Sequence, residues 1–549
     1  MTLFEAKFYF MAFIRIEKKK SGSYIRIVES YRDENNLCKH RTLYNLGKAE
    51  NYTSEQLKRI GTALFELGDG NINNLKSNSI KEISRYNYGF PLVYRQILKS
   101  YHLDILLDKY FHHGNLKINI LQCILLMLVE RLNDPVSKLS NYKNQHDYLG
   151  LEQVELHHLY RSLDFLANNQ EAVKVQIFNQ YRNLFNHKFD VVFYDVTTFY
   201  FESSIEKEGQ LRQKGFGKDG KIGDTQVVFG MLIDKNKHPV YYKLYDGKKY
   251  EGHTLTQALN ELKIRFSIDK IIVVSDTSIM NNKNIEFIEN ETYYEYIFGE
   301  RMKNLSEDKK NELINPENYT QLIKVINRQG KEVAISYYQT TYKNRTIIGT
   351  YSEKRARKDK QEREEKLRKA AILLENPSTI KRKAAHYYIK TKSKDEYEID
   401  TEKIKQSEKY DGYFCVATNI KNPNISELLD NYKHLFQIEH GFRTMKSHLE
   451  TRPMFHWTNS RIEGHICLCY IAYALLTNLQ IQLKKQNINM SENNIRSALS
   501  AMQMSLIQQG TDQYYLRSAL KPEQEQILKV LKIKELSDMI PKSHIDKYL

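Results

Sequence analysis

Apolar residues in the first part of the chain fall in short runs that are rich in β-branched and aromatic residues. Three such runs occupy residues 13–17, 24–31 and 37–46. Turn-like residues separate them, Lys-Ser-Gly-Ser at 20–23 and Asp-Glu-Asn-Asn at 33–36. Short apolar runs between such turns are typical of antiparallel strands. The pattern predicts a small basic β-meander, after which Thr53 opens a helix that continues to about Leu67.

From Pro91 to Asn186 the apolar residues recur at helical spacing, most densely over 116–132. Basic and aromatic side chains alternate at Tyr160-Arg161 and Tyr181-Arg182. A helical unit of this kind suits DNA binding, but it suits an ordinary helical bundle equally well. The sequence therefore predicts helices here and leaves these two interpretations open.

The pattern changes to that of a mixed α/β sheet at residue 189. The expected order is three strands, a helix, a strand, a helix and a strand, at 191–195, 227–233, 241–244, 254–266, 271–275, 282–288 and 294–299. Such an order is not that of an all-parallel sheet. Residues 303–408 interrupt it with strand-like runs and a charged helix over 352–369, whose alternating charges are typical of a solvated face.

A strand at 413–418 and a long helix over 426–450 follow, and helices are expected from Arg461 to the end. The chain is thus divided into an N-terminal β-meander with a helix, a helical region, a first core part, a β-rich insertion, a second core part and a helical C-terminus. The boundaries are 1–88, 89–188, 189–302, 303–408, 409–484 and 485–549.

Charge and cysteine content narrow the class of protein. The 549 residues carry a net charge of +16, which favours a polyanionic partner such as nucleic acid, although a lysine-rich surface would give the same value. The five cysteines form no CxxC pair, which argues against a disulfide framework or a zinc finger and fits a reducing cytoplasm. The apolar runs at 118–129 and 466–476 are too short to cross a bilayer and predict buried helices, so no membrane partner is expected.

Two aspartates occur in matching positions. Asp195 ends the apolar run VVFYD, and Asp276 ends the run VVSD. Ligands of open α/β sheets gather at the carboxyl ends of the strands, so both carboxylates are candidate metal ligands. The alternative is that each aspartate caps the turn that follows its strand.

Glu439 is the candidate third ligand. At 100° per residue, Tyr432, Leu435, Glu439 and Lys446 share one face of the predicted helix, with Arg443 beside them. A glutamate between a tyrosine and a lysine makes sense if Glu439 binds metal and Tyr432, Arg443 and Lys446 contact phosphates. An exposed i,i+4 pair of Glu439 with Arg443 is the alternative.

Three carboxylates are the ligands that a two-metal phosphoryl-transfer site needs. Oxygen ligands suit Mg²⁺, with Mn²⁺ also acceptable. Two such ions activate the attacking oxygen and stabilise the leaving one, without a covalent enzyme nucleophile. The expected cofactor is therefore two Mg²⁺ ions at Asp195, Asp276 and Glu439.

This arrangement resembles the DDE transposases of bacterial insertion sequences, in the superfamily named after insertion sequence four. Their signature, Tyr-x2-Arg-x3-Glu-x6-Lys, is present as Tyr432, Glu439 and Lys446, but Leu435 stands at the Arg position. Arg443 is the residue that we expect to supply the missing charge. The resemblance implies an RNase H-like core with a β-rich insertion between the second Asp and the Glu. It also implies that the insertion helps to organise the transposon end, so the Lys and Arg residues within 343–369 are expected either to contact DNA or to form a solvated face, and both interpretations stay open.

The resemblance also implies the activity and the partners. It implies cleavage at the ends of an insertion sequence and strand transfer into target DNA, by a homodimer that holds two double-stranded ends together near the nucleoid. The alternatives are another RNase H-like nuclease and a non-catalytic DNA-binding remnant of a transposase.

His253, His456 and His465 show no zinc-binding spacing and are expected to be structural. Trp457 either stacks on a base or fills the core, and we favour the core.

Overall fold

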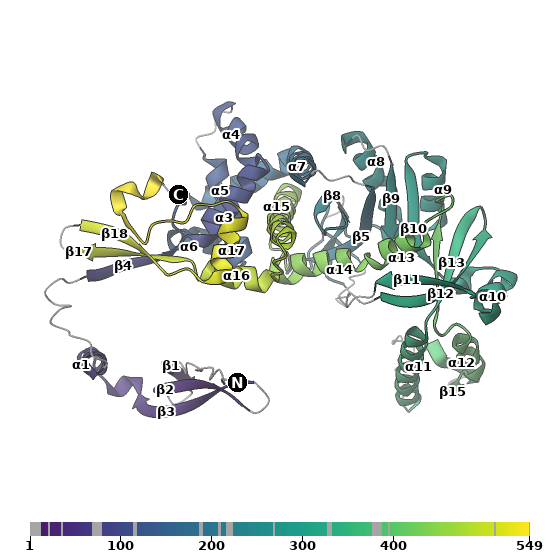
Figure 1. The fold of residues 1–549 in the computed structure, drawn as a ribbon, viewed down its shortest axis with the longest axis horizontal. Helices are drawn as coiled ribbons and strands as arrows, with labels where there is room; N and C mark the ends of the chain where they lie inside the picture. Colours follow the sequence, from purple (N-terminus) through teal and green to yellow (C-terminus); the bar gives the residue numbers. More distant parts are fainter. Residues whose placement is uncertain are drawn as a thin grey trace, which may run out of the picture. The chain divides into compact units, whose positions relative to one another are not determined.

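The computed structural model describes residues 12–19, 22–33, 37–67, 80–113, 118–185, 190–206, 210–215, 223–266, 270–326, 332–375, 387–393, 396–509 and 512–547. They form two compact units, drawn in Figure 1. One contains Met1–Ser84 and Leu506–Tyr515, and the other contains Arg85–Ser505 and Leu516–Leu549. The candidate catalytic residues all belong to the larger unit.

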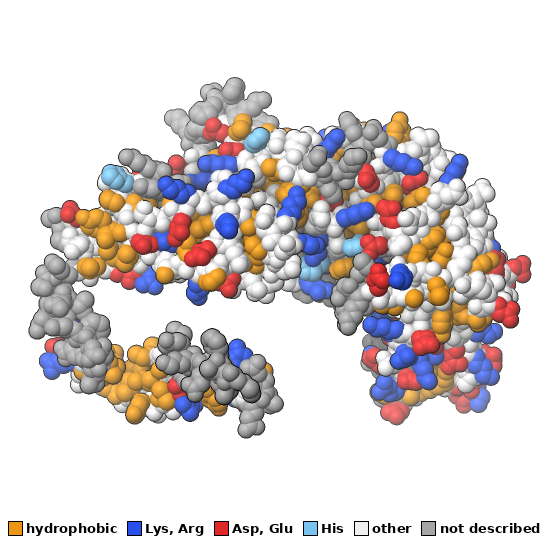
Figure 2. Space-filling model, in the orientation of Figure 1, with side chains coloured by type: hydrophobic (Ala, Val, Ile, Leu, Met, Phe, Trp, Pro, Cys, Tyr) orange, Lys and Arg blue, Asp and Glu red, His pale blue; other side chains and the backbone are white. Residues whose placement is uncertain are grey.

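The smaller unit begins with the predicted β-meander. Its three antiparallel strands are β1 (Ala12–Lys19), β2 (Gly22–Arg32) and β3 (Cys38–Lys48), and helix α1 (Ser54–Leu67) follows. Only Ile25 and Val28 of the described meander residues are buried apolar side chains. Figure 2 shows apolar side chains on the surface of this unit. The meander is therefore confirmed, with most of its apolar side chains in solvent.

The C-terminal region is not wholly helical, so that prediction is wrong in part. Helices α16 (Glu492–Ser500) and α17 (Pro522–Val530) are present. Strands β17 (Gln503–Gln509), β18 (Asp512–Arg517) and β19 (Met539–Pro541) are present as well. In the sheet, β17 lies between β18 and β4 (Ile80–Asn87). Met504 and Leu506 are buried at alternate positions, but the Gln and Ser residues around them hide this period of two.

Helices fill the region from residue 89 to 185, as predicted. They are α3 (Gly89–Ser100), α4 (Leu103–His113), α5 (Ile120–Asn133), α6 (Lys138–Asn144) and α7 (Leu156–Phe185). Helix α7 packs along α15 (Asn459–Lys485). Among the described helices, α15 has the length and apolarity of a membrane span, and 89% of its most apolar window is buried in the protein. The two longest apolar runs therefore form buried helices, as expected.

A mixed sheet is the core of the larger unit. Its central strands are β5 (Val191–Tyr200), β7 (Thr225–Ile233), β8 (Pro239–Asp246), β9 (Ile271–Ser275) and β10 (Tyr294–Glu300). Strands β5, β9 and β10 run parallel to one another, whereas β7 is antiparallel to β5. The helices between them are α8 (Leu255–Phe266) and α9 (Asn282–Asn290). The predicted element order is confirmed, except that β5 continues five residues beyond Asp195 instead of ending there.

The predicted β-rich insertion extends this sheet. The order β11-β12-β13-β16-β10-β9-β5-β7-β6 is continuous, with β11 (Gln321–Ile326), β12 (Glu332–Tyr342), β13 (Arg345–Tyr351), β16 (Tyr413–Thr418) and β6 (Gln213–Lys214). Apolar residues of β13 and β16 pair directly, as in Ile348 with Val416. Sequence order alone does not reveal this pairing, because α11 and other elements separate β13 from β16 in the chain.

Within the insertion, α11 (Glu353–Leu374) carries the alternating charges noted in the sequence. They form pairs one turn apart, such as Arg357 with Glu353 at 3.3 Å and Lys369 with Glu365 at 2.5 Å. Figure 2 shows both signs of charge interspersed over this part of the surface. This distribution fits the solvated face that the sequence predicted.

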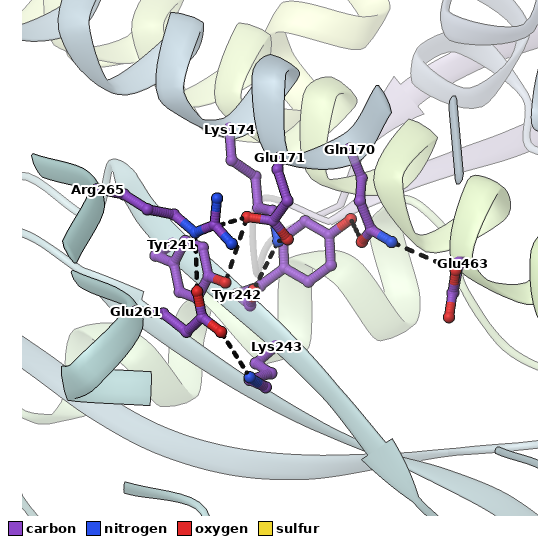
Figure 3. A network of polar contacts seen from close by, with 9 residues as sticks. All are labelled: Gln170, Glu171, Lys174, Tyr241, Tyr242, Lys243, Glu261, Arg265 and Glu463. Atoms are coloured by element: carbon purple, nitrogen blue, oxygen red, sulfur yellow. Dashed lines mark hydrogen bonds and ion pairs between the residues drawn. The ribbon is translucent and has the colours of Figure 1, made fainter. Parts of the chain in front are cut away.

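A buried cation ties α7 to the sheet (Figure 3). Lys174 is 1% exposed, and its ammonium group donates to Glu171 at 2.5 Å and to the carbonyl of Tyr242 at 3.2 Å. The rings of Tyr241 and Tyr242 lie 4.3 and 4.4 Å from the nitrogen. Because hydrogen bonds, one carboxylate and two aromatic faces replace its hydration shell, the charge is tolerated at this depth.

Candidate functional site

The predicted long helix over 426–450 is divided into three segments. Helix α13 (Ile425–Lys433) and helix α14 (Phe436–Arg443) are separated by a turn, and the π-helical segment Thr444–His448 follows. At the turn the amides of Leu435, Gln437 and Ile438 bond to carbonyls three residues back, at 2.9–3.2 Å. This tighter winding breaks the α-helical pattern. In Figure 1, α13 and α14 follow each other across the sheet, where α13 packs on β9 and β10 and α14 packs on β5 and β7.

Asp195 and Asp276 lie at the same level of neighbouring parallel strands. The last paired residues of β5 and β9 are Phe193 and Val274. Each aspartate follows its member of that pair by two residues. Gly299 of β10 occupies the next position in this row, because Phe298 pairs with Ser275. Neighbouring strands are about 4.8 Å apart, so the row places the two carboxylates side by side.

The row faces the side of the sheet that α14 covers. Asp195 pairs with Met231 of β7, and paired residues of an antiparallel ladder project from the same face. A Cβ atom added to Gly441 of α14 would lie 3.3 Å from Met231 Cε. Glu439 is two residues from Gly441 in the same short helix, and it is exposed. The fold therefore brings the helix of Glu439 to the face of the sheet from which Asp195 projects.

Tyr432 lies near both Asp276 and Glu439. Its hydroxyl sits directly over the Cα of Gly299, in space that any side chain at this position would fill. Burial, together with the negative charges of Asp276 and Glu439, raises the pKa of Tyr432 to about 12, against the effect of nearby Arg355. The phenol is therefore protonated at neutral pH, and it is a hydrogen-bond donor beside the carboxylates.

This close approach gives a prediction. Replacing Gly299 with alanine should place a methyl group against the Tyr432 hydroxyl and lower the free energy of unfolding by roughly 1 kcal/mol. The double variant Gly299→Ala/Tyr432→Phe should regain part of that stability, because phenylalanine lacks the overlapping oxygen. Urea denaturation of the two variants checks this. A double variant that is less stable than Gly299→Ala would contradict the placement of Tyr432.

The two aspartates also make local contacts. Asp195 Oδ1 accepts a hydrogen bond from the amide of Val196 at 2.7 Å, and Asp276 Oδ1 accepts one from Thr277 at 2.7 Å. Ser278 Oγ lies 3.4 Å from the other oxygen of Asp276. Asp276 thus contacts the turn that follows its strand, as the alternative interpretation expects. Its side chain is exposed nevertheless, so the carboxylate is open to solutes.

Glu439 does not form the predicted alternative pair. Within the described residues, neither Glu439 nor the exposed Arg443 has an ion-pair partner within 4.0 Å. Lys446 lies in the π-helical segment and is half-buried. Arg443 and Lys446 therefore add positive charge on the C-terminal side of Glu439.

The fit to metal ions is good for two ligands and incomplete for the third. Asp195 and Asp276 present hard oxygen donors side by side, which suits Mg²⁺ or Mn²⁺. Across the described residues, however, no three His, Cys, Asp or Glu side chains are close enough to hold one ion. The helix of Glu439 covers the same side of the sheet, but in this conformation the Glu439 carboxylate is too far from the two aspartates to share an ion with them.

Arg355 is a residue near the site that the sequence suggested only as one of the basic residues within 343–369. It belongs to α11 of the insertion, and its guanidinium lies 4.4 Å from the ring centroid of Phe414. Phe414 contacts Tyr432 in turn, with 5.2 Å between ring centroids. Arg355 therefore adds positive charge close to Tyr432. No local motif marks it, since its position depends on the pairing of β13 with β16.

Trp457 and His465, which follow the candidate site in the chain, differ in how far they are buried. His465 is 5% exposed, whereas Trp457 is 49% exposed, so the favoured core role of Trp457 is wrong. Its indole instead stacks on Arg212, 4.3 Å from the ring centroid. The expected core position fails because Trp457 lies in the loop before α15 and not in the helix.

His456 gives a prediction for pH dependence. Burial and the positive charges of Lys138, Arg131 and Arg461 lower the pKa of His456 from 6.5 to about 3. Below pH 6.5 the unfolded chain takes up a proton here and the folded chain does not, so stability falls as the pH drops towards 3. The slope for this residue is at most about 1.4 kcal/mol per pH unit. The urea midpoints at pH 7 and pH 5 should differ less in His456→Gln than in the native chain. An unchanged difference would contradict the lowered pKa of His456.

Comparison with known proteins bears on the first part of the chain. Residues 14–71 match the N-terminal domain of the IS1634 family transposases. This match supports an insertion-sequence transposase. The matched segment contains the β-meander and α1, outside the row of aspartates. No curated protein matches the chain.

Solved structures of a second transposase are also similar over part of the chain. The Mos1 transposase paired-end complex with left transposon end is 16% identical over 36% of this chain and 57% of that chain, with a TM-score of 0.15. A pre-cleavage Mos1 transpososome is 17% identical over 36% of this chain and 58% of that chain, again with a TM-score of 0.15. The similarity spans less than two thirds of those chains, and its low TM-score supports no conclusion about fold or activity.

Proposed function

We propose that this chain is a DDE transposase of the superfamily named after insertion sequence four, with an RNase H-like core. In this proposal it cuts DNA at the ends of its element and joins the freed 3′ ends to target DNA. The observation that carries the proposal is the row of Asp195 and Asp276 on neighbouring parallel strands, on the face covered by the helix of Glu439. The family match of residues 14–71 supports it independently.

Asp195 and Asp276 would hold divalent metal, Mg²⁺ or Mn²⁺, and Glu439 would complete the site. When bound, two such ions activate the attacking oxygen and stabilise the leaving oxygen of a phosphodiester. Glu439 would reach the aspartates by a shift of α14. This helix has eight residues and lies between a tightened turn and a π-helical segment, so it has irregular backbone at both ends to absorb a movement.

The other side chains would position DNA. The protonated Tyr432 hydroxyl would donate to a phosphate oxygen beside the carboxylates. Arg443 and Lys446 would neutralise phosphates on one side, and Arg355 would add positive charge on the other. Such contacts fix the position of the strand without reading its sequence. The substrate would be double-stranded DNA, with two protomers holding two ends.

The test is a joining assay with the full chain. A supercoiled plasmid that carries the DNA flanking the gene is incubated with the protein and Mg²⁺ and then analysed for nicks and for joined products. A transposase nicks at the element ends and joins them to a second plasmid. Nicking without joining would favour another RNase H-like nuclease, and DNA binding without nicking would favour a non-catalytic remnant.

Arg355 is tested in the same assay. Replacing it with glutamine should weaken cleavage by about tenfold, the usual effect of losing one charge-assisted contact. The matched control is Arg357→Gln, two residues further along α11, where the arginine pairs with Glu353. Equal activity of the Arg355 variant and the control would remove Arg355 from the proposed site.

A further inference from the structure

A cavity of about 380 Å³ lies away from the row of aspartates. Its walls come from the end of α5, the start of α6 and the loop before α15, and include Arg131, Lys138, Arg452, Trp457, Arg461 and His465. The loop joins the sheet where Met454 bridges Phe201, six residues beyond Asp195. At 3.3 Å per residue, six residues place Phe201 roughly 20 Å from Asp195 along the strand.

The cavity lining carries more basic than acidic side chains. Four of them are Lys or Arg, and Glu450 is the one carboxylate in the lining. One of the four, Arg461, pairs with Asp164 outside the lining at 3.8 Å. Lys138 is 4% exposed, and Arg131 is 6% exposed. Among the described residues, neither has a carboxylate within ion-pair distance. Lys138 donates to Asn141 Oδ1 at 3.4 Å, and the buried Glu130 is the carboxylate that acts on it from further away. Because buried cations are normally paired at closer range, this wall can accept an anion.

Two buried polar atoms in the cavity wall have no hydrogen-bond partner among the described residues. They are Arg131 Nε, which is a donor, and His465 Nδ1, which is the acceptor of a neutral ring whose Nε2 donates to the carbonyl of Thr451 at 3.2 Å. The other end of the Arg131 guanidinium donates to the carbonyls of Leu449 and Glu450, both at 3.2 Å, which fixes its orientation. An unsatisfied buried donor costs about 1–3 kcal/mol in a folded protein, so Arg131 Nε favours an anionic partner in this wall.

The electrostatics agree with this geometry. Burial and the charge of Arg131 lower the pKa of Lys138 from 10.5 to about 7. Lys138 and Arg131 also lower the pKa of His456, which lines the same cavity. Lys138 is therefore only partly protonated at pH 7, because burial and Arg131 disfavour its charged form. A bound anion would favour that charged form.

Aromatic side chains form the rim. Trp457 is 49% exposed, and Phe455 is 65% exposed. Arg212 lies between Trp457 and Phe201, with its guanidinium carbon 4.3 and 4.8 Å from the two ring centroids. This stack holds the indole in place while about half of its surface stays open. Exposed, fixed aromatic rings beside cations are typical of surfaces that bind nucleotides by stacking.

We propose that this cavity binds a nucleotide, with the phosphate against Lys138, Arg131 and Arg461 and the base on Trp457. Cationic donors suit the phosphate, and the indole suits the flat base. The volume is in the range of small-molecule sites. The nucleotide is either a free nucleoside monophosphate or one unit of a DNA strand. The second source rests on the proposed function, and the first does not.

The test uses the full chain and its intrinsic fluorescence. Trp457 is the single tryptophan in the sequence, so tryptophan emission reports on this rim alone. Deoxyadenosine 5′-monophosphate, a single-stranded oligonucleotide and inorganic phosphate are titrated separately, with EDTA present. The mononucleotide or the oligonucleotide should quench the emission saturably, and inorganic phosphate should bind more weakly. Tighter binding of the oligonucleotide than of the mononucleotide indicates a strand, and the reverse indicates a free nucleotide.

Two variants test the assigned phosphate contacts. Lys138→Gln and Arg461→Gln should each weaken binding by about tenfold. Arg461 is at the surface, so its variant serves if the buried Lys138 variant does not fold. Lys484→Gln, at the exposed end of the same helix α15, is the matched control and should bind as the native chain does.

Two results would overturn the proposal. One is no quenching by either nucleotide probe, and the other is equally tight binding of inorganic phosphate. Because EDTA removes divalent ions, the titration does not depend on the proposed catalysis. The variant Asp195→Asn should bind the mononucleotide normally, which separates a failure of this site from a failure of the proposed function.

Discussion

Asp195→Asn is expected to lose strand cleavage by about 1,000-fold or more, while binding of end DNA is retained. Asparagine keeps the size of the side chain but removes the negative charge that would hold metal. Metal ions contribute several kcal/mol to phosphoryl transfer, and a loss of about 4 kcal/mol corresponds to 1,000-fold. Nicking of an end-containing plasmid in Mg²⁺ measures cleavage, and gel mobility of an end duplex measures binding.

The matched control for this experiment is Asp430→Asn. Asp430 lies on α13, close in sequence to Tyr432, but its carboxylate contacts His434 at 3.4 Å instead of facing the sheet. We expect near-native cleavage from this control. Cleavage by Asp195→Asn within about tenfold of the native rate would remove the aspartate row from the proposed catalytic site.

Gly464→Ala is expected to destabilise the larger unit by roughly 3 kcal/mol. Gly464 lies in α15, against the backbone of α7. An added Cβ would overlap the carbonyl oxygen of Leu163, with its carbonyl carbon 2.6 Å away and its Cα 2.9 Å away. Backbone atoms cannot rotate aside, so α7 and α15 would have to move apart where they pack against each other in the core. The midpoint of urea denaturation measures the loss.

Gly61→Ala is the control for a glycine replacement in a helix. Gly61 lies in α1, and an added Cβ meets nothing within 4 Å. Alanine is the better helix former, so this change should stabilise its unit by roughly 0.5–1 kcal/mol. A Gly464→Ala protein as stable as the native chain would mean that α7 and α15 are not packed as closely as described.

Local patterns predicted most of the elements. The alternation of residues 13–46 gave the meander, and the apolar runs of β5 and β9 were evident because both strands are buried. The C-terminal strands were missed because polar residues separate Met504 and Leu506. The sequence predicts that β5 ends at Asp195, because the apolar run ends there. The strand instead continues to Tyr200, and beyond Phe193 it pairs with β7 and no longer with β9.

The positions of the candidate residues were predictable to the extent that they depend on spacing, while their role as a metal site stays a prediction. Two aspartates in equivalent sequence contexts lie in register, and Glu439 lies on the helix that covers them. The break at Leu435 was not predictable from periodicity, because the apolar spacing runs through it. Arg355 and the cavity beside Trp457 depend on tertiary packing between segments far apart in the chain, and no local pattern encodes that.

The continuity of the insertion with the central sheet limits how the chain can be shortened. Strand β16 pairs with β10 on one side and with β13 on the other. Deleting residues 303–408 would remove β13 and leave the apolar β16 as a bare sheet edge, with unpaired backbone groups that invite association with other chains. A truncated protein designed to be smaller would therefore be prone to aggregate, even though both core segments remained.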